Sequence, residues 1–522
     1  MKALTTLFAC ITLAGTLTFA AEDDPIKPLD DGEVAEVSRG TAVWSDRDYT
    51  FTEWPEDFAS HRVFHRSSIG KTKLEVLRPG YVVVLTPEDQ KFNQEHKLTF
   101  FHGFERVDLP PFHPYRINAE RIGNSCNILQ KKVVAGDVVD FGYYGIALWS
   151  DAPLPIVKED PDNPFLPIPT IDISGETERH SIVARGTKET YQGHVDTVLM
   201  PDGKTIWATW VINHAGHLGP LAKSEDGGKT WSGLLPSHPS WEEQTQTTPT
   251  IHRLVDPDGV ARLFVFAGQD FPGRLRQSYS EDEGKTWTAM AETGLKAECA
   301  PKTIMSFDEG KRLVMWCDRR GPDSKINESK GACVWESESL DGGLTWGPER
   351  VVVKTLSHWA QPAVIASDKD DTLIMLLRVN QNDYGQFAVS LDRGKTWSEA
   401  KQLPAALTGH RPAVKRAPDG RIVVVMRDTA TDFENGKIRN PTAGHFVAWV
   451  GTFDDILNGR DGQYRIKLLH SYAGRDTGYS GFELLPDGTF VATTYIKYQG
   501  GPEKHSVVST RFKLDELDAR LP

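Results

Sequence analysis

The sequence predicts an all-β protein: a six-bladed β-propeller preceded by a β-sandwich-like N-terminal domain. Three observations lead to this prediction. Short apolar runs occur in six pairs around tight turns, a Trp-containing turn motif recurs between them, and the chain has 45 Gly, 32 Pro and 14 Trp. Repeated hairpins with frequent turns and buried aromatic residues are typical of propellers.

The turn motif occurs in four copies, each with Ser, Asp, Gly, Thr and Trp in the same order. The copies span residues 224–231, 280–287, 339–346 and 390–397. Asp and Ser side chains can bond local backbone amides, and Gly tolerates a positive φ. We therefore interpret the four aspartates as turn-forming residues and not as catalytic ones.

Six hairpins are predicted, each around a tight acidic or glycine-containing turn. The turns lie at residues 202–203, 258–259, 309–310, 370–371, 419–420 and 487–488. Together with the Trp-containing turns, these hairpins describe six four-stranded blades. The last two blades lack the Trp-containing turn, so we expect degenerate outer strands there. We expect Ser181–Val183 to close the ring by joining the last blade.

The chain divides into three parts. Residues 1–21 resemble a signal peptide, with Lys2, an apolar stretch and small residues before an acidic segment. Residues 22–175 contain short alternating runs typical of a β-sandwich and end in a Pro-rich linker, and residues 176–522 form the propeller. We therefore expect an exported protein, located in the periplasm, outside the cell or at the cell surface.

Composition excludes several partners. The net charge of −13 argues against binding nucleic acid or an anionic membrane surface. No segment after the signal approaches the roughly 20 apolar residues of a membrane span. The expected compartment permits disulfides, and we expect one among Cys299, Cys317 and Cys333, without a prediction of which pair forms.

Hairpin geometry predicts a site. Residues equally distant from a turn meet across the two strands, so counting eight positions outward places one pair per blade at the same mouth of the channel. The paired residues form a ring that includes Arg378, Arg411 and Arg427. Because converging arginines repel each other unless they meet an anion or carboxylates, this ring predicts an anion-binding site. The pairs are His194 with Trp210, Thr250 with Phe266, Pro301 with Cys317, Pro362 with Arg378, Arg411 with Arg427, and Tyr479 with Tyr495.

The four turns, the six blades and Gly478-Tyr479-Ser480 resemble the sialidase (neuraminidase) superfamily, whose repeats are called Asp boxes or BNR repeats. The resemblance covers roughly residues 180 to 512. It implies a glycoside hydrolase in which Tyr479 is the nucleophile and Arg378 holds the substrate carboxylate, with Arg427 as a further member of the clamp.

The sequence departs from this family at three places. Residues 193–196 replace its Arg-Ile-Pro motif, and Gln361 stands where a glutamate activates the tyrosine. His214 and His217 occupy the loop where the resemblance implies an aspartate that acts as the acid. The site thus exchanges two acidic roles for imidazoles, so the identity of the sugar substrate stays open.

Three functions remain in competition. The first is a retaining exo-glycosidase acting on a terminal acidic sugar. Tyr479 would attack the anomeric carbon, and His194, His214 or His217 would exchange protons. The second is a polysaccharide lyase on uronate-containing glycans that uses His, Tyr and Arg. The third is a non-catalytic glycan-binding propeller. All three require a glycan partner, and none requires a cofactor or a metal.

Under the first function, each candidate residue has an assigned role. The hydroxyl of Tyr479 is expected to meet a base, with Asp270, Asp318 and His194 as candidates in that order. Asp428 and Asp476 are further sources of a carboxylate. The substrate-binding candidates are Arg378, Arg411, Arg427, His214, His217, Gln361 and Tyr495.

Overall fold

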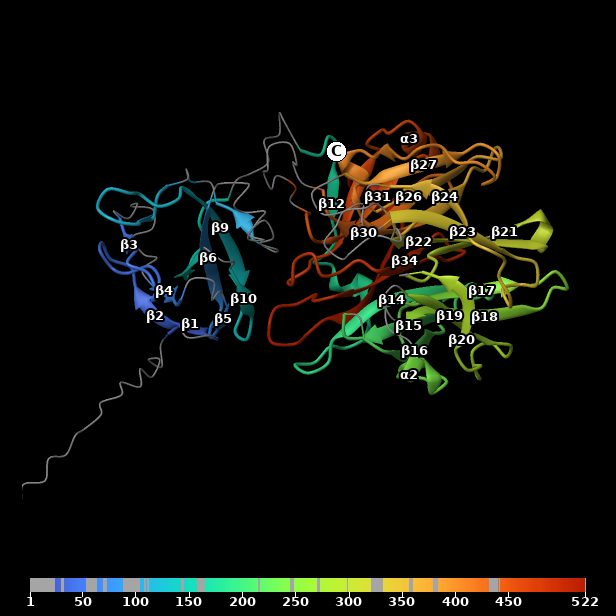
Figure 1. Cartoon of the computed structure of the whole chain (residues 1–522), viewed down its shortest axis with the longest axis horizontal. Coiled ribbons are helices and arrows are strands. Elements are labelled where there is room, and N and C mark those ends of the chain that lie inside the picture. The colour runs from blue at the N-terminus through green and yellow to red at the C-terminus, as the bar shows by residue number, and fades with distance from the viewer. Residues whose placement is uncertain are drawn as a thin grey trace, which may run out of the picture. The chain divides into compact units, whose positions relative to one another are not determined.

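The computed structural model is drawn in Figure 1. It describes residues 24–521 except 30–31, 53–62, 69–72, 88–103, 108, 110–111, 142–144, 157–164, 215, 245–247, 270–272, 298, 321–331, 356–359, 379–383, 431–439 and 441. The predicted signal peptide, the core of the predicted linker and Asp270 therefore lie outside the described residues. The chain forms two compact units, one of residues 1–98 and 110–153 and one of residues 99–109 and 154–522.

The first unit consists of short β-strands arranged in sheets. One sheet has the order β1-β5-β10, and a larger one contains β2-β4-β11-β6-β9 in adjacent positions. The neighbouring strands β11, β6 and β9 of this sheet carry most of their apolar side chains buried. The strands are β1 (Ile26–Pro28), β2 (Glu33–Glu36), β3 (Thr50–Phe51), β4 (Val63–Arg66), β5 (Lys73–Val76), β6 (Gly80–Pro87), β8 (Tyr115–Arg116), β9 (Cys126–Val133), β10 (Val138–Asp140) and β11 (Ile146–Ser150).

The second unit contains six sheets, which are the six predicted blades, and its segment 99–109 holds β7 (Glu105–Arg106). All six predicted hairpins form. Blade one is β14 (Gln192–Leu199), β15 (Ile206–Ile212) and β16 (Leu218–Ser224); blade two is β17 (Thr250–Val255), β18 (Ala261–Gln269), β19 (Arg274–Ser280) and β20 (Ala291–Lys296); blade three is β21 (Thr303–Phe307), β22 (Arg312–Arg320), β23 (Ala332–Ser339) and β24 (Arg350–Lys354). Blade four is β25 (Ala363–Ala366), β26 (Leu373–Leu377), β27 (Gln386–Ser390) and β28 (Lys401–Gln402); blade five is β12 (Thr170–Asp172), β29 (Gly409–Arg416), β30 (Ile422–Asp428), β31 (Phe446–Gly451) and β32 (Tyr464–Leu469); blade six is β13 (His180–Ala184), β33 (Ser480–Leu484), β34 (Phe490–Ile496) and β35 (Ser506–Phe512).

Side chains from the first strands of different blades meet around the propeller axis. Lys302, which directly precedes β21, donates from Nζ to Asp196 of β14 at 2.5 Å and to the carbonyl of Ser480 in β33 at 2.6 Å. Glu483 of β33 accepts a hydrogen bond from the hydroxyl of Thr197 in β14. It also accepts one from Nζ of Lys415 in β29 at 3.3 Å. Charges on blades one, three, five and six are thus neutralised where their inner strands converge.

The ring is closed as predicted, by a strand that joins the last blade. β13 pairs antiparallel with β35, and Figure 1 draws the early strands in green beside the red strands of blade six. The outer strands of blades five and six are complete, which corrects the expectation that they are degenerate. In blade five the helix α3 (Phe453–Leu457) takes the place of the Trp-containing turn. Thr452 caps the N-terminus of this helix and forms a capping box with Asp455.

Strand number also differs from four in two blades. Blade one has three strands among the described residues, whereas blade five gains β12, which pairs in parallel with β32. The other helical segments are short: η2 (Thr177–Arg179), α2 (Ser240–Gln244), η3 (Asp308–Gly310), η4 (Ala405–Leu407) and α4 (Leu514–Asp518). Among the described residues, no helix has the length and apolar character to cross a membrane.

The four repeated turns have one common hydrogen-bond pattern. In the first, Ser224 donates to Asp226 at 2.8 Å and accepts from the amide of Gly228 at 2.8 Å, and Asp226 accepts from the amide and hydroxyl of Thr230. The same bonds recur in the other three copies. The aspartates hold the turns together, as their sequence context indicated.

Candidate active site

The predicted site residues lie at one end of the inner hairpins. His194 is in β14, Arg411 is in β29, and Tyr479 directly precedes β33. Arg378 follows β26, and Arg427 lies near the end of β30. Different blades therefore supply these side chains from the same end of the sheets.

The counted register holds only where the hairpins are regular. The pairs Thr250–Phe266 and Ser480–Thr494 agree with the count. In the other four blades the partners are displaced by one residue, because turn lengths differ or the register shifts. The shift in β29 leaves Arg411 unpaired in the ladder, as an inserted residue is in a β-bulge.

The hydroxyl group of Tyr479 is held by an amide and a guanidinium group. Gln361 Nε2 donates to it at 2.9 Å, and Arg378 Nη1 donates at 3.2 Å. Gln361 Oε1 in turn accepts from Arg378 Nη1 at 2.9 Å, and the same amide nitrogen lies 3.1 Å from Cys299 Sγ. Within the described residues, no carboxylate or imidazole bonds to this hydroxyl, so neither His194 nor Asp318 has the predicted contact with it.

Arg411 covers the ring of Tyr479 from one side. Its guanidinium carbon lies 5.2 Å from the ring centroid, within the range of a cation–π interaction, and its Nη2 donates to the carbonyl of Ala300 at 3.1 Å. Arg411 and Gln361 both have positive φ, 53° and 37°, which is strained for residues with a side chain. Such strain accumulates at functional sites.

His194 stacks on the ring of the same tyrosine. The ring centroids of His194 and Tyr479 lie 4.0 Å apart at an interplanar angle of 27°. Nδ1 of His194 contacts the hydroxyl of Thr248 at 3.4 Å, and the buried Nε2 has no hydrogen-bond partner in the described part of the chain. Burial, helped by the neighbouring His214, holds the pKa of His194 well below its usual value, so this imidazole is neutral.

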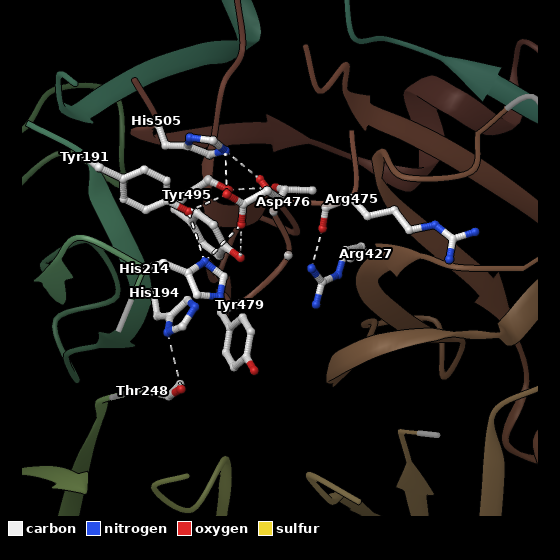
Figure 2. Close-up of polar contacts among 12 residues, drawn as sticks. Tyr191, His194, His214, Thr248, Arg427, Arg475, Asp476, Tyr479, Tyr495 and His505 are labelled. Carbon is white, nitrogen blue, oxygen red and sulfur yellow. Dashed lines mark hydrogen bonds and ion pairs between the residues drawn. The ribbon is translucent and has the colours of Figure 1, made fainter. Parts of the chain in front are cut away.

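A second cluster surrounds Asp476, as Figure 2 shows. Its carboxylate accepts from the hydroxyl of Tyr191 at 2.8 Å and from that of Tyr495 at 3.1 Å. Nδ1 of His214 lies 3.1 Å from Asp476 Oδ1, and Nε2 of His505 lies 3.3 Å from Oδ2. Burial opposes ionisation, but the hydrogen bond from His214 and the charge of His505 outweigh it, so the pKa of Asp476 is well below its usual range.

The two clusters are in contact. The rings of His194 and His214 are 4.6 Å apart, and that of Tyr495 is 5.1 Å from His194. Burial raises the pKa values of Tyr191 and Tyr495. Both phenols therefore stay protonated and act as donors to the carboxylate.

Arg427 lies at the edge of the same region in Figure 2. Its Nη1 donates to the carbonyl of Arg475, and its backbone passes so close to Gly478 that a β-carbon there would meet the β-carbon of Arg427 at 2.3 Å. Gly478 also has a φ of 96°, which favours glycine. The glycine before Tyr479 thus allows Arg427 and Tyr479 to approach each other.

Two of the predicted carboxylates have structural roles away from the Tyr479 hydroxyl, and one predicted histidine is exposed. Asp318 is buried and accepts from the amide of Ala360 at 2.9 Å, a structural role next to Gln361. Asp428 forms a fully buried ion pair with Arg465 at 2.7 Å. Asp270 lies outside the described residues. The side chain of His217 is exposed and contributes no hydrogen bond to the site among the described residues.

Cysteines of blade three do not form the expected disulfide. Cys126, Cys299, Cys317 and Cys333 are all free, which corrects that prediction. Burial raises the pKa values of Cys299 and Cys317, so both are protonated thiols. Cys299 instead packs beside Gln361 and contacts Thr248.

Sequence reasoning missed Tyr191, His505, Thr248 and Cys299. Tyr191 lies just before β14 and His505 just before β35, so the two residues are far apart in sequence. Neither position falls among the hairpin pairs that the sequence predicted. Their aromatic and imidazole character close to predicted inner and outer strands was the available signal. Among the described residues, no group of three or more His, Cys, Asp or Glu is arranged to hold a metal ion.

The fold and this site define a β-propeller with a cluster of tyrosine, arginine and histidine side chains at one end of its inner strands. No family model matches the chain, and no curated protein matches it. Solved structures with a similar fold do exist. They are a protein of unknown function from Dyadobacter fermentans (16% identity, covering 64% of this chain and 97% of that one, TM-score 0.48), the NanB sialidase from Streptococcus pneumoniae (11%, 94% of each, TM-score 0.43), and the leech intramolecular trans-sialidase (12%, 95% and 94%, TM-score 0.43).

Proposed function

We propose that this protein is a carbohydrate-active enzyme, a sialidase-like exo-glycosidase that cleaves a terminal acidic sugar with Tyr479 as nucleophile. The observation that carries the proposal is the bonding of the Tyr479 hydroxyl to Arg378 and Gln361, beneath the guanidinium group of Arg411. We further propose, from the predicted signal peptide, that the enzyme acts outside the cytoplasm.

The arginines support an anionic substrate. Arg411 and Arg427 donate to backbone carbonyl groups, and in the described part of the chain neither forms an ion pair with a carboxylate. A carboxylate on the sugar can accept paired hydrogen bonds from such groups. Nε2 of His194, buried against Tyr479 and without a hydrogen-bond partner among the described residues, offers a further polar contact for the sugar.

The chemical step needs one proton shared between the tyrosine and an acid. In the reactive form Tyr479 is a phenolate, stabilised by Arg378, and the acid is protonated. The phenolate oxygen forms a bond to the anomeric carbon while the glycosidic C–O bond breaks, and the acid gives its proton to the leaving oxygen. Water then attacks the anomeric carbon, returns a proton to the acid and releases the phenolate.

A lyase is the second candidate, and Gln361 favours it. An amide and an arginine beside a tyrosine can neutralise a uronate carboxylate, which makes the α-proton easier to remove. The phenolate would then take that proton, and the glycosidic C–O bond at the neighbouring carbon would break as the double bond forms. A second group, such as a histidine, would give a proton to the leaving oxygen. A carboxylate base at the tyrosine is not needed for this reaction.

The test uses the purified full chain on sialosides and on uronate-containing polysaccharides, with products identified by mass spectrometry. A released saturated monosaccharide supports the hydrolase, and an unsaturated uronate absorbing in the ultraviolet supports the lyase. A 2-fluorinated substrate analogue that labels Tyr479 would establish covalent attack. Glycan binding without any product would refute both enzymatic functions.

A further inference from the structure

Three histidines were candidates for the proton transfer, and the structure separates them. His194 is only 4% exposed and is neutral, so it cannot serve as a protonated acid near neutral pH. His217 is exposed and lacks a side-chain partner in the described part of the chain. His214 has a side chain that is 58% exposed and a carboxylate partner, so it combines access to solvent with a fixed orientation.

Asp476 determines which nitrogen of His214 lies toward Tyr479. Nδ1 lies 3.1 Å from Asp476 Oδ1 and 3.3 Å from the hydroxyl of Tyr191. Because the carboxylate accepts a hydrogen bond, Nδ1 carries the proton in the neutral ring, and Nε2 is the nitrogen that gains and loses one. Figure 2 shows this second nitrogen on the side of His194 and Tyr479.

The carboxylate itself is held firmly. Tyr191 and Tyr495 each donate a hydroxyl hydrogen to it. Nε2 of His505 lies 3.3 Å from Oδ2 of Asp476 and 2.8 Å from the backbone carbonyl oxygen of Asp476. These partners come from the start of blade one and from blade six. An aspartate supported in this way keeps the same orientation while the imidazole changes its charge.

We infer that His214 is the proton-transfer residue of the site and that Asp476 is the positioning residue that sets its tautomer. The inference rests on the proposed function, since it assumes that a leaving oxygen needs a proton. In the step, the proton moves from His214 Nε2 to that oxygen as the C–O bond breaks, and neutral His214 then takes a proton from the attacking water. The role requires no additional reactant.

The kinetic test compares two leaving groups. The wild type, His214→Gln and Asp476→Asn are assayed on 4-nitrophenyl and methyl glycosides of N-acetylneuraminic acid and glucuronic acid. A good leaving group needs no acid, so both variants should lose about 10²–10⁴-fold on the methyl glycoside and less than tenfold on the nitrophenyl one. An equal loss on both substrates, or no loss, would overturn the inference.

His217→Gln is the comparison for the exposed loop histidines. The loss on the methyl glycoside should be at least tenfold larger in His214→Gln than in His217→Gln. A larger loss in His217→Gln would transfer the role to that residue and refute the inference. His214 is exposed, so its variant tests the role even if Asp476→Asn does not fold.

A second readout is independent of turnover. Nitrogen-15 spectra of histidine-labelled protein report which ring nitrogen carries the proton, and the signals of His214 are identified by their absence in His214→Gln. We expect the Nδ1–H tautomer in the wild type and a shift toward Nε2–H in Asp476→Asn. An unchanged tautomer would overturn the inference, whereas a wild type that cleaves none of the glycosides would count against the proposed function alone.

Discussion

The side-chain amide of Gln361 lies between the Tyr479 hydroxyl and Arg378, donating from Nε2 to the first at 2.9 Å and accepting at Oε1 from the second at 2.9 Å. Arg378 also donates directly to the same hydroxyl. The phenol oxygen therefore receives two hydrogen bonds and has one hydrogen left to give. This geometry stabilises negative charge on the oxygen, and among the described residues no group accepts its proton.

Gln361→Glu should supply that missing base. The new carboxylate would accept the phenol proton and remain paired with Arg378, so hydrolytic turnover should rise several-fold. The change is measured as kcat on the glycoside identified by the screen. Gln361→Glu combined with Tyr479→Phe is the control and should show no gain. A fall in kcat for the single variant would argue against attack by the tyrosine.

Tyr479→Phe should lower kcat by several orders of magnitude, because it removes the nucleophilic oxygen and leaves the ring in place. The stacking with His194 and the contact with Arg411 need only the ring, so ligand affinity should change by less than about fivefold. Single-turnover kinetics and calorimetric titration measure the two effects. Near-normal turnover would remove Tyr479 from the chemistry.

Arg378→Lys should weaken binding of carboxylate substrates. Lysine keeps the charge but loses the planar pair of donors, so KM should rise by about 10–100-fold. The methyl ester of the same sugar lacks the charged carboxylate and should show a much smaller difference between wild type and variant. Arg350→Lys, on the outer strand of blade three, is the matched control. Equal effects on acid and ester would contradict carboxylate recognition.

Acid should destabilise the propeller through histidines that are buried in the neutral form. Burial lowers the pKa of His252 to about 4, and Nε2 lies 2.9 Å from the carbonyl of Pro301. Between pH 6.5 and about 4 the unfolded chain binds a proton that the folded chain does not. The free energy of unfolding therefore falls as the pH is lowered, by up to about 1.4 kcal/mol per pH unit for this group. Urea unfolding at several pH values should show a shallower slope for His252→Gln, and parallel curves would refute the assignment.

Asp226→Ala should destabilise the first repeated turn. It removes the hydrogen bonds from Ser224 and from the amide and hydroxyl of Thr230, so the free energy of unfolding should fall by about 1–2 kcal/mol. Urea denaturation measures this loss. The adjacent exposed Glu225→Ala is the control, and equal losses would show that the turn does not depend on Asp226.

The features that the sequence predicted are those encoded by local chemistry. Each hairpin lies around its own turn, and each repeated turn is closed by neighbouring residues, so short segments were sufficient. The ring of residues came out only in part. The register shift that displaces Arg411, and the convergence of Tyr191 and His505 on Asp476, depend on packing between distant segments. In blade five the helix α3, whose first turn is closed by a capping box, stands in place of the repeated turn.

Closure of the ring by β13 and β35 has a consequence for biosynthesis. His180 and Thr510 are hydrogen-bonded partners separated by 330 residues in sequence. During translation, β13 leaves the ribosome first and exposes an unpaired edge until β35 is made, and such edges promote aggregation. We therefore expect the nascent chain to be prone to aggregation until blade six is complete, and ribosome stalling inside that blade should yield products that are rapidly degraded.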